Sequence, residues 1–444
     1  MSATNSLSVY EGRNVNLEAY RAAFDEVRAE FEQTVATFGL PFEREESQPR
    51  ALRADAVCAH CENNTASLWN TWISPACLAC RTGEETATFF VSLKCTRRCY
   101  FCFNVNQEDY EFYRTHERDI ASELQRAHAA GVTFRHLAIT GGEPCLHPER
   151  VLEFVHCAKR LYPDAHVRMY TSGDLLDDEL LDALAHAGLD EIRFSVKPEE
   201  SCEQREETLA RIGAAVGRIP DVMVEMPVIP GTLDDMKELL QRLDSLGVRG
   251  INLLEFCFPL ANSEAFAARG FKLRRNPYDI PYNYWYAGGL PIAGSENACL
   301  ELLQFADQAK LHMGVHYCSL DNKFSGQIYQ QNKPFLLDRS FAARHAWLSF
   351  DEDDYFLKCA KVFGKDVEVV KRIIANSFAD AQEDGCDSSF LDTEIPLLAF
   401  PLAWIPFIVQ QAPRVDIGVS INVLEPGEGE PYRIRELALE RWRG

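Results

Sequence analysis

Short apolar runs alternate with helical stretches between residues 85 and 260, and this alternation constrains the fold more than any other feature of the chain. Runs rich in branched and aromatic residues predict six strands, at 88–94, 136–140, 166–171, 191–197, 223–229 and 250–256. Stretches with helical periodicity separate them, at 118–130, 149–161, 177–187, 204–217 and 233–246. Strand–helix alternation implies parallel strands joined by right-handed crossovers. The sequence therefore predicts an α/β fold in which the carboxyl ends of six parallel strands meet at one edge.

A cysteine-rich loop follows the first of these strands. It reads Cys95-Thr-Arg-Arg-Cys99-Tyr-Phe-Cys102. Three thiolates suit a [4Fe–4S] cluster, which takes four cysteines in its usual ligation, and they leave one iron open for chemistry. There are two alternatives. The three cysteines could have no metal-binding role, or they could be three of the four ligands of a zinc site whose fourth ligand comes from elsewhere in the chain. The spacing favours the cluster.

A glycine-rich turn, Gly141-Gly142-Glu143-Pro144, follows the second strand. Glycines let the backbone approach a ligand closely, and proline fixes the turn. The two motifs, in this order at successive strand ends, resemble those of the radical S-adenosylmethionine (radical SAM) superfamily. The resemblance covers about residues 85–260, and more loosely extends to about 320. It implies a partial (β/α)6 radical SAM barrel, which is a TIM-like barrel that does not close.

The resemblance also implies which residues bind SAM beside the Gly141–Pro144 turn. The open iron would chelate the amine and carboxylate of the methionyl end, and Glu143 would supply an anion near the ammonium group. Phe101 would lie against adenine, with core packing as a compatible role. Strand-end positions add Ser172 after the third strand, Ser195 in the fourth and Ile229 in the fifth. Each of these three could instead finish a strand or cap a helix.

A second cysteine set precedes the barrel. Cys58-Ala-His-Cys61 and Cys77-Leu-Ala-Cys80 are two CxxC pairs with fifteen residues between them. This spacing predicts a four-thiolate site for structural zinc or for an auxiliary iron–sulfur cluster. A mixed site that uses His60 is a third alternative. The motif fixes the number of ligands better than the identity of the metal.

Polar residues in two late strands are candidates for catalysis. Glu255 ends the sixth strand, and alternation places it on the opposite face from Asn252. His316 and Cys318 share one face of a further strand-like run at 313–319. Polar side chains that point inward from apolar strands need a partner or a ligand. Satisfied polar groups of the core are the alternative.

Charge and composition limit the other classes of function. The formal net charge of −22 disfavours general nucleic-acid binding. Arg97-Arg98 and Arg274-Arg275 are candidates for a local basic patch, but we expect them to be solvated surface charge. No run approaches the ~20 apolar residues of a membrane span. Fifteen cysteines without a recognisable signal peptide predict a reduced, cytoplasmic compartment, in which metal ligation explains cysteines better than disulfides do.

Composition predicts four segments along the 444 residues. They are an N-terminal helical segment (1–57), the four-cysteine metal-binding segment (58–84), the barrel (85–335) and a C-terminal α+β extension (340–444). An excursion at 258–294, rich in Pro, Asn, Tyr and Gly, is expected to be a lid or a surface loop.

Periodicity also predicts elements outside the barrel. A helix at about 16–38 is expected to pack on the barrel. The C-terminal extension is expected to contain helices at about 352–363 and 366–378, and strand-like runs at 394–410 and 415–424.

The resemblance implies an oxidoreductase-like activity. A reductase such as flavodoxin or ferredoxin would supply an electron, SAM would be cleaved reductively, and a 5′-deoxyadenosyl radical would abstract a hydrogen from an unidentified substrate. An oxygen-labile cluster suits an anaerobic setting. Peptides and proteins are candidate substrates. A weaker likeness to proteins related to pyruvate formate-lyase activating enzymes makes a glycyl-radical-enzyme activase one alternative. The rival from another class is a non-enzymatic zinc or iron–sulfur scaffold or electron carrier.

Overall fold

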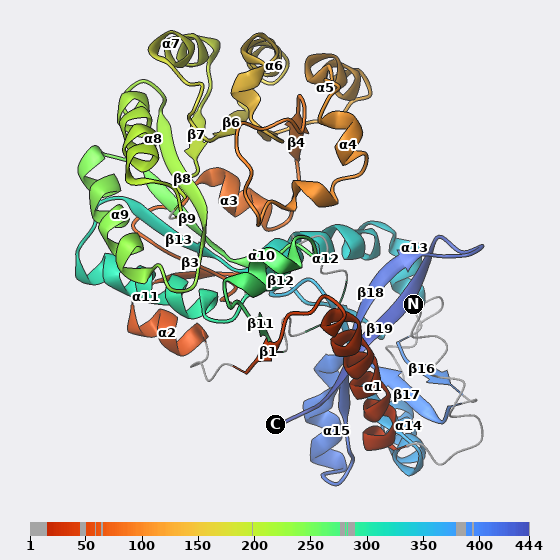
Figure 1. Cartoon of the computed structure of the whole chain (residues 1–444). Helices are drawn as coiled ribbons and strands as arrows, with labels where there is room; N and C mark the ends of the chain where they lie inside the picture. The colour runs from red at the N-terminus through yellow and green to blue at the C-terminus, as the bar shows by residue number, and fades with distance from the viewer. Residues whose placement is uncertain are drawn as a thin grey trace. The chain divides into compact units, whose positions relative to one another are not determined.

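The computed structural model describes residues 16–44, 50–57, 59–63, 65–197, 199–275, 280, 282, 289–378, 388–392 and 395–443 (Figure 1). The chain forms two compact units. The large unit contains residues 39–277 and 284–326, and the small unit contains residues 1–38, 278–283 and 327–444. Cys58 of the predicted metal site lies outside the described residues, as does most of the aromatic run within the 258–294 excursion. None of the helices in the described residues has both the length and the apolarity needed to cross a bilayer.

One nine-stranded sheet forms the centre of the large unit, in the order β2-β3-β13-β9-β8-β7-β6-β5-β4. Neighbours from β4 to β9 and on to β13 pair in parallel, whereas β3 runs antiparallel to β13 and β2 antiparallel to β3. No pairing among the described strands joins β4 to β2, so the sheet is open. The strands are β2 (His60–Glu62), β3 (Ser67–Asn70), β4 (Thr86–Phe90), β5 (His136–Thr140), β6 (His166–Thr171), β7 (Glu191–Phe194), β8 (Asp221–Val228), β9 (Gly250–Glu255) and β13 (Gly314–Cys318).

Helices connect the parallel strands and bury one face of the sheet. They are α5 (Ile120–Ala129), α6 (Pro148–Leu161), α7 (Asp178–Ala187), α8 (Cys202–Ala215), α9 (Leu233–Leu246) and α11 (Ser295–Gln308). Alternate strand residues such as Leu137 and Ile139 face this layer and share one buried apolar core with Leu124 and Phe154. The predicted partial (β/α)6 barrel is confirmed, and β13 extends it by a seventh parallel strand.

The opposite face of the sheet carries polar side chains and a short helix, α3 (Pro75–Cys80). Arg193 on β7 donates to Ser74 Oγ at 3.0 Å, and Ser74 caps the amino end of α3. Asn252 on β9 and Arg193 both lie within reach of Cys77 Sγ, at 3.9 and 3.4 Å. The second CxxC pair is therefore held against the inner face of the sheet.

Shorter elements complete the large unit. They are β1 (Phe42–Glu43), α2 (Arg50–Ala56), η3 (Phe103–Asn106), α4 (Tyr110–Tyr113), η4 (Pro144–Leu146), β10 (Cys257–Phe258), α10 (Ser263–Ala268), β11 (Leu273–Arg274) and β12 (Leu290–Pro291). Helix α12 (Leu320–Leu337) begins in the large unit and ends in the small one.

A six-stranded antiparallel sheet forms the small unit, in the order β16-β17-β15-β18-β19 with β14 beside β15. Its strands are β14 (Ser349–Phe350), β15 (Leu357–Phe363), β16 (Phe390–Asp392), β17 (Leu397–Phe400), β18 (Gly418–Pro426) and β19 (Tyr432–Arg441). Its helices are α1 (Leu17–Ala36), α13 (Arg339–Arg344), α14 (Lys365–Ser377), the 3₁₀ turn η6 (Leu402–Trp404) and α15 (Ile405–Gln411).

Several predictions for the chain ends need correction. The helix predicted at 352–363 is wrong, because Leu357–Phe363 is the central strand β15. The strand-like run predicted at 394–410 holds β17 but ends in helix α15. The N-terminal helix is confirmed as α1, which belongs to the small unit and packs there against β19.

Candidate functional site

The predicted cluster loop lies between β4 and η3. Cys95 is exposed, whereas Cys99 and Cys102 are half-buried. The backbone N–H of Cys102 donates to the Cys99 carbonyl oxygen at 3.2 Å, so the chain turns between the last two cysteines. Burial raises the pKa of the Cys99 and Cys102 thiols, and each of the three thiols lies within electrostatic reach of the other two. The loop therefore gathers three sulfur atoms at the carboxyl end of the first parallel strand.

The glycine pair after β5 lies against the segment that leads into the cysteines. The N–H of Gly142 donates to the Ser92 carbonyl oxygen at 3.0 Å, and the N–H of Glu143 donates to that of Lys94 at 2.8 Å. A Cβ atom at residue 142 would lie 1.8 Å from the Lys94 carbonyl oxygen. Gly141 adopts a φ of +111°, which side-chain-bearing residues rarely adopt. The structure thus requires glycine here to let two backbone segments meet, a reason that the sequence did not reveal.

Glu143 is buried and its carboxylate is saturated with donors. One oxygen accepts from Thr171 Oγ1 at 2.7 Å and from the N–H of Cys145 at 3.1 Å. The other accepts from the N–H and the hydroxyl of Ser172, at 2.7 and 2.6 Å. Glu143 therefore fastens the end of β5 to the end of β6. The predicted SAM contacts Glu143 and Ser172 are brought together, as direct partners of each other.

Arg97, inside the cysteine loop, is clamped by two acidic residues. Its guanidinium pairs with Asp174, which follows β6, and with Glu200, which follows β7. Thr96 donates to the same Asp174 carboxylate at 2.7 Å. The expectation that Arg97 is solvated surface charge is wrong, because only 15% of its side chain is exposed. Sequence reasoning missed this clamp, although acidic residues just after two neighbouring strands were a usable indication.

Residues 90–243 match the sequence profile of the Radical SAM superfamily. The match begins at the last residue of β4 and includes both the cysteine loop and the glycine turn. The chain therefore contains a radical SAM domain over these residues. It is a radical SAM enzyme by the same evidence, and by its similarity to relatives that are named as enzymes.

Three comparisons illustrate the range of similar proteins. A protein of Methanocaldococcus jannaschii named as a glycyl-radical enzyme activating enzyme is 24% identical over 355 residues, which cover 77% of this chain and 89% of that protein. The GTP 3′,8-cyclase of Chlorobaculum tepidum is 37% identical over 107 residues, 24% of this chain and 31% of the cyclase. Streptococcus suis SuiB bound to the precursor peptide SuiA is a solved structure with 10% identity and a TM-score of 0.39. That match covers 69% of this chain and 64% of SuiB. The chain thus spans less than two thirds of the cyclase and of SuiB.

A radical SAM domain implies a [4Fe–4S] cluster and SAM, and the residues present fit both groups. Cys95, Cys99 and Cys102 supply soft sulfur ligands, which suit iron–sulfur clusters. The Gly141–Gly142 backbone is bare of side chains beside this loop, and Asn104 Nδ2 holds the Gly141 carbonyl at 2.5 Å. The donor set and the open backbone therefore agree with the cofactors that the superfamily implies.

The remaining predicted SAM contacts have different surroundings. Phe101 is half-buried, and its ring packs edge-on against Phe256 at a centroid distance of 5.7 Å. Ser195 is half-buried just beyond β7, and its N–H donates to the Thr171 carbonyl oxygen at 3.2 Å. Ile229 is buried just beyond β8. Phe101 and Ser195 thus retain exposed surface near the strand ends, whereas Ile229 belongs to the packed interior.

Polar residues on the inner face of the sheet form a network that sequence reasoning missed. The guanidinium of Arg193 pairs with Glu191 and with Glu225. Asn252 Nδ2 donates to Glu225 at 2.8 Å, and Asn252 Oδ1 is buried without a hydrogen-bond partner. Alternating polar residues in β7, such as Glu191 and Arg193, were the sequence indication of this network.

The candidate catalytic residues Glu255, His316 and Cys318 each have their own partners. Glu255 accepts from buried Arg274 at 2.7 Å and from the N–H of Leu320 at 2.9 Å. The expectation that Arg274 is solvated surface charge is therefore wrong. His316 Nε2 lies 2.8 Å from Ser67 Oγ, and burial lowers the pKa of His316 to about 3. It is a neutral imidazole at physiological pH.

Cys318 lies two residues beyond His316 on the same inner face. Burial raises the pKa of Cys318 to about 12, so that it remains a thiol at physiological pH. Asn322 Nδ2 lies 3.3 Å from its Sγ atom. Cys77 and Cys80 lie within electrostatic reach of Cys318, whereas Glu255 is turned toward Arg274.

Proposed function

We propose that Cys95, Cys99 and Cys102 bind the [4Fe–4S] cluster of this enzyme, and that SAM binds beside them along the Gly141–Pro144 turn. When bound there, the cluster supplies the electron that cleaves SAM into methionine and a 5′-deoxyadenosyl radical, which abstracts a hydrogen from the substrate. The observation that carries this proposal is the packing of the cysteine-loop approach, Ser92–Lys94, directly on Gly141–Glu143.

The chain's own residues have supporting roles in this proposal. Arg97, Asp174 and Glu200 tie the cysteine loop to the ends of β6 and β7, which limits its movement when the cluster is loaded. Glu143 fixes the ends of β5 and β6 relative to each other. Lys197 lies close enough to Cys99 to oppose the effect of burial on that thiol, so its ammonium group favours thiolate ligands. A reductase such as flavodoxin or ferredoxin is the proposed electron donor.

The test is anaerobic reconstitution with iron and sulfide, followed by dithionite and SAM, with 5′-deoxyadenosine measured by mass spectrometry. The wild-type protein is expected to form it, and Cys99→Ala is expected to form none. Cys202→Ala is the matched control, because Cys202 is exposed at the start of α8 and is expected to behave like wild type. Equal product from Cys99→Ala and wild type would refute the proposal.

We propose a peptide or a protein as the substrate class. The support is the relative named as a glycyl-radical enzyme activating enzyme, whose length is matched over 89%. A lysate from cells grown on deuterated glycine provides the test. Deuterium is expected in 5′-deoxyadenosine when the fraction above 10 kDa is added. If only the fraction below 3 kDa transfers deuterium to 5′-deoxyadenosine, a protein substrate is excluded. If neither fraction transfers deuterium, an activase that acts on glycine is excluded.

We also propose a second metal centre that includes Cys77 and Cys80 and that holds either structural zinc or an auxiliary cluster. The support is the spacing of the two CxxC pairs, which predicts a site with four thiolates. X-ray absorption separates the alternatives. An auxiliary cluster is supported if the wild type holds more than about four iron atoms per chain and the Cys77→Ala/Cys80→Ala variant loses the excess. Zinc with sulfur neighbours at about 2.3 Å would refute an auxiliary cluster.

A further inference from the structure

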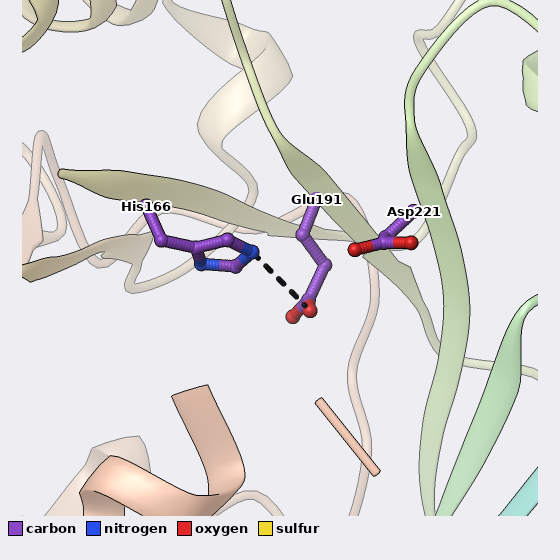
Figure 2. A group of neighbouring side chains, drawn as sticks. All are labelled: His166, Glu191 and Asp221. Carbon is purple, nitrogen blue, oxygen red and sulfur yellow. Dashed lines mark ion pairs between the residues drawn. The ribbon is translucent and has the colours of Figure 1, made fainter. Parts of the chain in front are cut away.

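Three side chains with metal-binding groups converge at the amino ends of neighbouring parallel strands. His166, Glu191 and Asp221 are the first residues of β6, β7 and β8. Their ligand atoms all lie within 4.8 Å of one another, and in the part of the chain that the structure describes they are the one such group. Figure 2 shows the Glu191 side chain between the His166 imidazole and the Asp221 carboxylate, and His166 Nε2 lies 3.7 Å from Glu191 Oε2. Because parallel strands share a direction, this end of the sheet is opposite to the cysteine loop.

The histidine of this group is available as a ligand. Both ring nitrogens of His166 are buried, and neither has a hydrogen-bond partner. Buried polar atoms without partners are costly and need an explanation, such as a bound ion. Burial lowers the pKa of His166, and the charges of Glu191 and Asp190 oppose this effect.

The Glu191 carboxylate is paired with buried Arg193, whereas the Asp221 carboxylate has weaker compensation. Glu191 is completely buried, and Asp221 is half-buried beside it. The nearest cation to Asp221 is Arg249, whose Nε lies 3.6 Å away and whose side chain is 54% exposed. Burial, and then the charge of Glu191, raise the pKa of Asp221. Two neighbouring carboxylates and an imidazole present the donor set that zinc-like divalent cations accept.

Neighbouring residues hold Glu191 in the orientation that a ligand needs. Ser74 Oγ donates to Glu191 Oε2 at 2.6 Å, and Arg193 Nε donates to the other oxygen, Oε1. Oε2 is also the oxygen nearest His166, so Arg193 does not occupy the metal-facing side of the carboxylate. The Arg193 charge is shared with Glu225, which reduces its repulsion of a cation. Outer hydrogen bonds of this kind orient metal-binding carboxylates.

We propose that His166, Glu191 and Asp221 bind a divalent cation of the zinc class, with the fourth position taken by water. The ion would join β6, β7 and β8 at their amino ends. Through Ser74 it would also fix the start of α3, and with it the position of Cys77. At the amino ends of parallel barrel strands, residues serve stability more than chemistry. The site is separate from the proposed SAM chemistry and does not rest on it.

The test uses the reconstituted holoenzyme, treated with a chelator and then titrated with Co²⁺ or Zn²⁺. One ion per chain is expected, with nitrogen and oxygen neighbours at about 2.0–2.1 Å in X-ray absorption and without sulfur at about 2.3 Å. His166→Gln and Asp221→Asn are expected to weaken binding at least 100-fold. Ser74→Ala, which retains all three ligands, is expected to weaken it 10- to 100-fold. His186→Gln is the matched control, because His186 is exposed on α7.

Two outcomes would overturn the proposal. One is that the wild type binds no stoichiometric ion with nitrogen and oxygen neighbours. The other is that Ser74→Ala and His166→Gln bind it as tightly as wild type does. Circular dichroism and iron content identify a variant that fails to fold, and Ser74→Ala still tests the site if Asp221→Asn is such a variant. Cys77→Ala/Cys80→Ala is expected to retain the ion, which separates this site from the second cysteine centre.

Discussion

Replacing Gly142 with alanine is expected to separate the cysteine loop from the glycine turn, because the structure leaves no room for a side chain. The new Cβ would lie 1.8 Å from the Lys94 carbonyl oxygen and 2.4 Å from its carbonyl carbon. Both are backbone atoms, so one of the two segments must move. Movement breaks the hydrogen bonds donated by Gly142 and Glu143, each worth about 1 kcal/mol net, and strain adds about 1–3 kcal/mol. The expected loss in free energy of unfolding is about 3–5 kcal/mol.

Urea unfolding of the large unit, followed by the fluorescence of its tryptophans, measures this loss, and iron per chain after reconstitution measures the effect on the loop. Gly213→Ala is the matched control. Gly213 lies inside α8, and its added Cβ would make an ordinary contact of 3.5 Å with Leu246. Alanine there is expected to stabilise the helix by about 0.5–1 kcal/mol. The reasoning is refuted if Gly142→Ala unfolds within about 1 kcal/mol of wild type and binds the same amount of iron.

Three further predictions follow from buried polar groups. In Glu143→Gln, the new amide N–H₂ group faces hydrogen-bond donors from Thr171 and Ser172, so the free energy of unfolding should fall by about 2–3 kcal/mol. Calorimetry should also show weaker SAM binding. Glu149→Gln, on the exposed side of α6, is the control and should have neither effect. A double-mutant cycle of unfolding with Arg97→Ala and Asp174→Asn should give a coupling energy of about 1–3 kcal/mol. Both variants should also release iron to a chelator faster than the wild type does. Additive effects on unfolding would show that the ion pair is unimportant. The pKa of His316 is about 3 in the folded protein and about 6.5 in the unfolded chain. The free energy of unfolding should therefore decrease as the pH falls below about 6.5, by about 2–3 kcal/mol at pH 4.5. His316→Gln should flatten this pH dependence.

The barrel strands were predictable because apolar runs and helical periodicity alternate so regularly, but their ends were not. The strand predicted at 88–94 is hydrogen-bonded as β4 only through Phe90. The chain bends at Val91 and Leu93, and the carbonyl groups of Ser92 and Lys94 accept hydrogen bonds from the glycine turn. An apolar run therefore predicts which residues are buried. It does not predict where a strand ends, because that depends on which segment lies beside it.

The error at 352–363 has a different cause. Residues 357–363 form the central strand of the small sheet, flanked by β17 and β18, and almost all of them are buried. Lys361 is buried as well, and its ammonium group pairs with Glu436 on β19 at 2.9 Å. Its partners on β17 and β18 lie 34 to 65 residues further along the chain, and local propensity contains no information about them.

The same limit applies to the candidate sites. The cysteine spacing and the glycine turn were visible because their residues are contiguous in sequence. The Arg97 clamp and the group of His166, Glu191 and Asp221 combine residues from three separate loops or strands each. Only the register of the sheet brings these together, and register is a property of the folded protein.

The position of α3 limits where a substrate can react. Cys77 on α3 lies against Arg193 and Asn252, so protein fills the inner side of the sheet at the level of β7 and β9. In the proposed reaction, a substrate would therefore approach from the carboxyl ends of the strands, where the cysteine loop and the glycine turn lie. The second CxxC pair, which precedes the first barrel strand in sequence, is thus part of the inner surface and not a separate appendage. Substitutions that alter substrate choice without altering SAM cleavage are accordingly expected at the carboxyl ends of β8, β9 and β13, and beside α3.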